Sequence, residues 1–151
     1  MSSQDVARAG RRAVVDELQR RGAIARLSNV PRVHVIATDS EQKRTVRIQV
    51  KTKRHDKAEH WQESDAEKLR NESKTAGGSD FVVLVDLQQN AATKFYVGDL
   101  RGFAAQVVQR YDKWMAAHGG SRPGGSDSAH TSIDVDDFEP WLDCWDILGI
   151  V

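Results

Sequence analysis

The chain has 151 residues, of which 39% are hydrophobic and 29% are charged. This composition excludes a wholly disordered chain, and the length suits one globular domain with a real core. The apolar runs are too short to cross a bilayer, and the first residues lack the basic and apolar segments of a secretory signal. The single cysteine, Cys144, has no partner for an internal disulfide, so we expect a cytoplasmic protein without a membrane partner.

Charge is unevenly distributed along the chain, although the formal net charge is +0. Residues 1–75 carry 17 Lys and Arg against 11 Asp and Glu, whereas residues 76–151 carry 5 against 11. A basic half is typical of a surface that neutralises nucleic-acid phosphates. The alternative is that the two halves neutralise each other within the fold.

The first half of the chain predicts a helix followed by strands. Apolar or small residues recur every four positions in the first segment and form one stripe of an amphipathic helix: Val6, Gly10, Val14 and Leu18. We expect a helix over 2–21 that starts in a capping box, a strand over 23–27, a turn at 28–31, and a hairpin of strands over 33–38 and 44–53.

The second half alternates between apolar runs and polar connections. The polar stretch 55–73 is compatible with a helix, and the apolar run 81–85 predicts a central strand buried on both faces. We then expect a loop at 75–79, a strand over 94–97, a helix from Asp99 to about Ala117, a flexible loop at about 118–132, and a short acidic amphipathic element over 136–148. This order predicts a single α/β domain over 1–151, with a mixed β-sheet flanked by α-helices.

Gln49 and Lys51 are the residue pair that points most clearly to chemistry. Two positions apart on a strand, their side chains project from the same face. An amide oxygen there can ligate a divalent cation, while the lysine can orient or help deprotonate a metal-bound water. This spacing is compatible with phosphodiester hydrolysis, although a lone Q-x-K also occurs on ordinary surface strands.

The sequence around this pair resembles a known family. The run VHVIATDSEQKRTVRIQVKTK, residues 33–53, is similar to the core hairpin of the PD-(D/E)XK nuclease superfamily, especially small bacterial endonuclease-like proteins with an IQVKT motif. The likeness continues through Trp61-Gln62, the strands over 81–87 and 94–97, and the closing WLDCWDILG at 141–149. The resemblance implies a restriction-endonuclease-like mixed sheet and an endodeoxyribonuclease dependent on Mg²⁺ or Mn²⁺.

The resemblance also implies a metal site built around Gln49, with Lys51 as the catalytic lysine. Where the family places an aspartate at the start of the first hairpin strand, this chain has His34. A neutral imidazole and an amide supply no negative charge for Mg²⁺, which prefers carboxylate and water oxygens. Asp39 is the alternative ligand, although the hairpin places it in the loop.

Nucleic acid is the partner that these features favour, and a protein partner is the alternative. A basic run follows the motif, and the residues expected to contact phosphates are Arg47, Lys53, Arg54 and Lys57. We therefore expect a DNA-binding, endonuclease-like protein whose metal-dependent hydrolysis is weakened or lost. The alternative is a non-enzymatic module of the same fold that binds a protein partner through its acidic C-terminal half.

Overall fold

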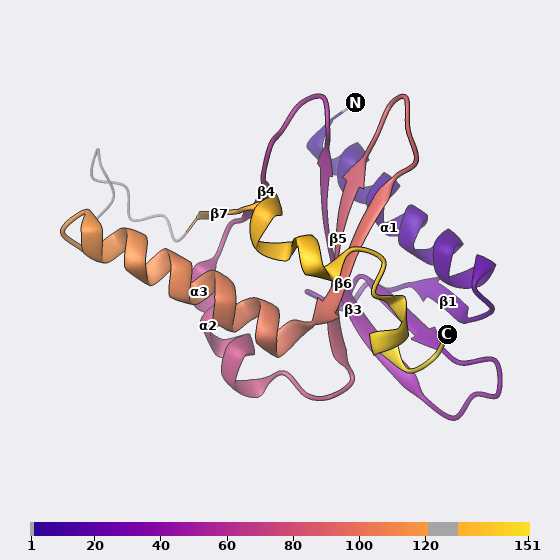
Figure 1. Ribbon diagram of the computed structural model, residues 1–151. Helices are drawn as coiled ribbons and strands as arrows, with labels where there is room; N and C mark the ends of the chain where they lie inside the picture. The colour runs from indigo at the N-terminus through magenta and orange to yellow at the C-terminus, as the bar shows by residue number, and fades with distance from the viewer. Residues whose placement is uncertain (1, 121–129) are drawn as a thin grey trace.

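The computed structural model describes residues 2–120 and 130–151. In this part of the chain a mixed five-stranded sheet is covered by helices on both faces (Figure 1). The elements in chain order are α1 (Ser3–Arg20), β1 (Ile24–Leu27), β2 (Val35–Thr38), β3 (Thr45–Arg54), β4 (Trp61–Glu63), α2 (Ala66–Thr75), β5 (Asp80–Leu87), β6 (Lys94–Asp99), α3 (Leu100–Ala117), β7 (Thr131–Ile133), and the 3₁₀ helices η1 (Val135–Trp141) and η2 (Trp145–Leu148). The predicted α/β class is confirmed.

The sheet has the strand order β1-β2-β3-β5-β6. Strands β1, β2 and β3 form an antiparallel meander, β5 lies parallel to β3, and β6 returns antiparallel to β5. The connection from β3 to β5 passes through α2, as a parallel pairing requires. The long strand β3 is therefore central, and it pairs with β5 all the way from Arg47 to Arg54.

Helix α1 covers one face of the sheet. Its predicted capping box is present, with Ser2 and Asp5 bonded to each other's backbone N–H groups. Its buried residues, including Val14 and Leu18, pack against the even-numbered residues of β3. The helix approaches β3 closely at Gly10, which has no side chain. A Cβ at this position would lie 1.8 Å from the hydroxyl oxygen of Thr52. The apolar stripe predicted for this helix is confirmed.

Helices α2 and α3 cover the opposite face, as Figure 1 shows. Both begin at an aspartate whose carboxylate accepts backbone N–H groups of the first turn, Asp65 for α2 and Asp99 for α3. Leu69 of α2 and Phe103 of α3 belong to the core cluster that covers Val82 and other residues of β5. The odd-numbered side chains of β3 point to this side, which the alternation pattern predicted.

Three predicted segments differ from the structure. The stretch 55–73 is not one helix, because Trp61–Glu63 forms the strand β4 and α2 begins only at Ala66. The predicted loop at 118–132 extends too far, because Thr131–Ile133 forms β7 and pairs with β4. Residues 121–129 of that loop lie outside the described residues. The closing segment 136–148 folds into η1 and η2, which pack along β6.

No helix in the described part of the chain combines the length and the apolar character needed to span a membrane.

Candidate functional site

Strand β3 directs its odd-numbered side chains toward the α2 side of the sheet, where four of them, at positions 47, 49, 51 and 53, each meet an acidic partner. Gln49 is 2% exposed, and the side chain of Lys51 is 12% exposed. The four contacts are Arg47 to Asp80 at 2.7 Å, Gln49 to Glu72 at 3.2 Å, Lys51 to Glu63 at 3.0 Å, and Lys53 to Asp86 at 3.1 Å. The predicted pair therefore lies together, beside two carboxylates.

Glu63 is the acidic residue that lies deepest in this group. It ends β4, in which Trp61 and Glu63 are buried and Gln62 between them is exposed. Pairing of β4 with β7 holds the short strand in place. One carboxylate oxygen of Glu63 accepts the Nζ hydrogen of Lys51, and the other accepts the backbone N–H of Asp65 at 3.0 Å. Such partners are needed, because an unpaired buried carboxylate is strongly unfavourable.

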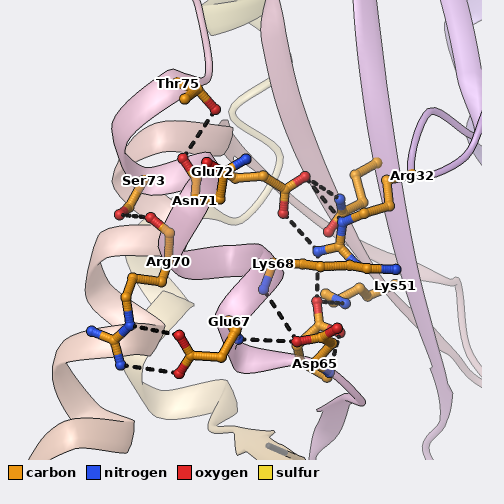
Figure 2. A network of polar contacts seen from close by, with 12 residues as sticks. Arg32, Lys51, Asp65, Glu67, Lys68, Arg70, Asn71, Glu72, Ser73 and Thr75 are labelled. Atoms are coloured by element: carbon orange, nitrogen blue, oxygen red, sulfur yellow. Dashed lines mark hydrogen bonds and ion pairs between the residues drawn. The ribbon is translucent and has the colours of Figure 1, made fainter.

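Arg32 joins Glu63 to Glu72 of α2. Its guanidinium lies 2.8 Å from the carboxylate of Glu63 and 2.6 Å from that of Glu72. Arg32 lies in the segment that precedes β2. Figure 2 shows its side chain between Glu72 and Lys51. Its backbone is left-handed, with φ of 62°, a conformation that costs a residue with a Cβ about 1–2 kcal/mol. The two ion pairs therefore hold Arg32 in a strained turn.

The network contains two cations, Arg32 and Lys51, and two carboxylates, Glu63 and Glu72, so its formal charges cancel. Burial alone would raise the pKa of Glu63, but Lys51 and Arg32 outweigh burial and hold it down at about 2. Burial lowers the pKa of the Lys51 ammonium, against the opposing effect of Glu63. Glu63 is thus ionised at neutral pH. Lowering the pKa of Lys51 brings it closer to the range in which an amine transfers protons.

Gln49 has one amide atom without a partner. Its Nε2 donates to Glu72, whereas its Oε1 is buried and accepts no hydrogen bond from the described residues. Rotating the amide by half a turn would bring its oxygen against the carboxylate of Glu72, which has no proton to donate. A water or a cation is the kind of group that would satisfy this oxygen.

His34 and Asp39 have other partners. The Nδ1 atom of His34 accepts the backbone N–H of Val50 at 2.8 Å, where β3 extends beyond the start of β2. Burial, and then the positive charge of Arg11, lowers the pKa of His34 to about 4. Asp39 lies in the turn between β2 and β3, where its carboxylate accepts two backbone N–H groups. Four residues of strand, about 13 Å, separate that turn from Gln49.

A metal would find oxygen donors here, but they are already engaged. The described residues contain no group of three or more His, Cys, Asp or Glu side chains that could hold a metal ion. The oxygens that share a partner are the carboxylates of Glu63 and Glu72, both bonded to Arg32, and the Gln49 amide that donates to Glu72 has a further buried oxygen, Oε1, without a partner among the described residues. These are the donor types that Mg²⁺ prefers. Arg32 and Lys51 neutralise the two carboxylates, so a cation binds only where Arg32 is displaced.

The residues predicted to contact nucleic acid are mostly neutralised. Arg47 pairs with Asp80 on the surface, and Lys53 is buried against Asp86. Arg54 pairs with its neighbour Asp56. Lys57 is exposed and has no ion pair with any residue in the described ranges. The segment after the motif therefore offers less free positive charge than its composition indicates.

Three residues of the network were not singled out by sequence reasoning, namely Arg32, Glu63 and Glu72. Arg32 follows a proline in a predicted turn, and both glutamates lie in a stretch predicted to be a polar helix. The one usable signal was the W-Q-E triplet at 61–63, in which a buried tryptophan precedes the glutamate by two positions. In a strand this spacing puts both side chains on the same face.

Comparisons with known proteins add no relative. No family model, no curated protein and no solved structure matches the chain.

We predict that replacing Glu63 by Gln destabilises the protein, because the ammonium of Lys51 stays buried without its carboxylate. Breaking a buried ion pair costs about 3–5 kcal/mol, measured here as the free energy of unfolding in denaturant. The matched control is Glu67→Gln, since Glu67 is exposed and pairs with Arg70 on the surface, where a salt bridge contributes about 0–1 kcal/mol.

Adding Lys51→Met to Glu63→Gln should recover part of the loss, because the unpaired charge is then gone. Equal stabilities of Glu63→Gln and Glu67→Gln would contradict the buried network.

Proposed function

We propose that this chain is a DNA-binding, endonuclease-like protein of the PD-(D/E)XK type. Its site for metal-dependent phosphodiester hydrolysis is formed by Gln49, Lys51, Glu63 and Glu72. One observation carries the proposal: Gln49 and Lys51 project from one strand into the same buried space as two carboxylates. The resemblance of residues 33–53 to the family hairpin supports it independently of the geometry.

Each side chain has a role that its surroundings allow. Oε1 of Gln49 is a buried oxygen without a hydrogen-bond partner among the described residues, and the glutamates would supply the negative charge that the amide lacks. A bound Mg²⁺ or Mn²⁺ would polarise the phosphate and lower the pKa of a water. Lys51 lies 3.0 Å from Glu63, where its ammonium orients the attacking water and stabilises charge on the phosphate oxygens.

Arg32 explains why hydrolysis should be slow. Its guanidinium lies within hydrogen-bonding distance of both carboxylates, which is the position that a cation would take. The side chain of Arg32 is 25% exposed and borders a cavity of about 610 Å³ on the outer side of the network. It can therefore swing into this cavity without crossing the core. We propose that catalysis requires this displacement.

A second function is favoured by the same charge balance. Because Arg32 and Lys51 fully neutralise the two glutamates, the network can also stabilise the fold without any metal. The apolar side chains left exposed in the acidic C-terminal half, Leu142, Ile147 and Val151, would then serve as a surface for a protein partner. The nuclease assay separates the two functions.

We expect the intact protein to cleave DNA in Mg²⁺ or Mn²⁺ and not in a chelator, with single-stranded, duplex and branched substrates compared. Lys51→Ala should lower the rate by about 100-fold, as for loss of a catalytic proton-transfer group. The control is Lys68→Ala, an exposed lysine of α2 that makes no ion pair with the described residues. If neither the intact protein nor Lys68→Ala cleaves any substrate, the enzymatic proposal is wrong and the protein-binding function takes its place.

We also expect Arg32→Asn to bind Mn²⁺ more tightly than the intact protein, because the variant removes the guanidinium from both carboxylates and leaves Lys51 as the one cation on Glu63. Asparagine tolerates the left-handed backbone of this position. The gain should be about tenfold or more, equivalent to about 1.4 kcal/mol, in calorimetric titrations. Arg26→Asn removes an exposed arginine that has no ion pair with the described residues, and it serves as the control. Unchanged Mn²⁺ affinity, or a gain that survives the added substitution Glu63→Gln, would exclude this site.

A further inference from the structure

A cluster of three arginines with little or no carboxylate pairing among the described residues lies on the first half of α1: Arg8, Arg11 and Arg12. Arg11 and Arg12 have no carboxylate within ion-pair distance among the residues that the structure describes. Arg8 has only Asp5, at 4.0 Å and on an exposed surface, where such a pair contributes little. The last turn of α1 differs, because Arg20 and Arg21 share Glu17. The free charge is therefore confined to the first half of the helix.

These arginines border a cavity of about 540 Å³ between α1 and the turn that follows β1. Its walls carry donors and no acidic side chain, and its lining residues are Arg8, Ala9, Arg11, Arg12, Leu27, Ser28, Asn29 and His34. Asp5 and Asp16 are the other acidic residues of the helix besides Glu17, and neither lines the cavity. A concave surface with this lining attracts anions.

His34 supplies a further donor to the same cavity. Its Nδ1 accepts the backbone N–H of Val50, so this nitrogen carries no proton. In the neutral ring the proton is then on Nε2, which makes that atom a hydrogen-bond donor. The histidine thus adds an N–H group without adding a charge that would repel the arginines.

One hydrogen-bond donor of the Arg11 side chain lacks an acceptor among the described residues. Its Nε is buried, and no atom of the described residues accepts its hydrogen bond. A buried donor without an acceptor is destabilising. An oxyanion in the cavity would give the Arg11 guanidinium an acceptor, because its oxygens accept hydrogen bonds from guanidinium and imidazole groups together.

We propose that this cavity binds a phosphate of a nucleic-acid backbone through Arg8, Arg11 and Arg12, with His34 as a neutral donor. The inference rests on the DNA-binding half of the proposed function and names the surface that performs it. It does not depend on hydrolysis. A polynucleotide is favoured over a small anion because three arginines within one turn of α1 carry more positive charge than one small anion neutralises. The cavity lies on the α1 side of the sheet, and Gln49 and Lys51 project from the opposite face of β3.

This surface positions a nucleic acid without reading its sequence. The groups that line the cavity are suited to phosphate oxygens, and contacts to phosphate carry no direct sequence information. Binding should weaken steeply with salt, since each neutralised phosphate releases counterions. Leu27, which is 44% exposed and lines the same cavity, is available to contact a sugar or a base.

The test is fluorescence anisotropy with labelled single-stranded and duplex oligonucleotides over a range of salt concentrations. The variant is Arg11→Gln/Arg12→Gln, which keeps the hydrogen-bonding amide and removes two charges. The matched control is Lys68→Gln/Lys113→Gln, which removes the same charge from α2 and α3 on the other face of the sheet. Thermal unfolding of each variant verifies that the fold is intact.

We expect the arginine variant to lose about tenfold or more in affinity, with the slope of log affinity against log salt reduced by about 2. The lysine control should stay within about twofold of the intact protein, since general charge contributes little at a distance. Arginine-dependent binding without cleavage would support this surface while the hydrolytic proposal fails.

Three results would overturn the inference. Equal losses in the arginine and lysine variants would mean that only overall charge matters. DNA binding or cleavage that is indifferent to Arg11 and Arg12 would leave the proposed function standing without this surface. Binding to vesicles of phosphatidylserine and phosphatidylcholine, or to inorganic phosphate, with no affinity for either oligonucleotide, would assign the cavity to another phosphate source.

Discussion

The burial of the Glu63 carboxylate between two cations is the constraint on which the site depends. Glu63 is 2% exposed, and an ion that far from water is tolerated only when it is paired and hydrogen-bonded. Lys51 and Arg32 supply the charges, and the backbone N–H of Asp65 supplies a further hydrogen bond. Because the pKa of Glu63 is held below its ordinary value of 4.5, its stabilising effect is fully present above that pH and is lost as the pH falls toward about 2.

This interaction connects elements that are distant from one another in the sequence. It fixes β4 against β3, it ties the turn before β2 to α2 through Arg32, and it keeps the Lys51 ammonium in a desolvated place. The same contacts that stabilise the fold also occupy the carboxylates that a metal would use. Stability and hydrolysis therefore compete for Glu63 and Glu72, and the side-chain position of Arg32 decides between them.

Sequence reasoning succeeded where the signal was local. The four-residue repeat of α1, the alternation along β3 and the apolar run of β5 each arise from neighbouring residues, and each was found in the structure. The partners of Gln49 and Lys51 were missed because they come from other elements: Gln49 meets Glu72 across 23 residues, and Lys51 meets Glu63 across 12. Arg32 joins the two glutamates from 31 and 40 residues away. A periodic pattern of residues indicates local structure and does not reveal such distant contacts. His34 could be aligned with a family position, but its bond to the Val50 N–H depends on where β2 stops pairing with β3.

The most direct test of this account is the ionisation of Glu63, followed through its side-chain carboxyl carbon by nuclear magnetic resonance during an acid titration. We expect the carboxyl to remain ionised well below its ordinary pKa of 4.5 and to titrate near 2, because Lys51 and Arg32 stabilise the charged form. A midpoint at or above 4.5 would mean that burial dominates and that neither cation is in contact. The ion-paired site described above would then be wrong.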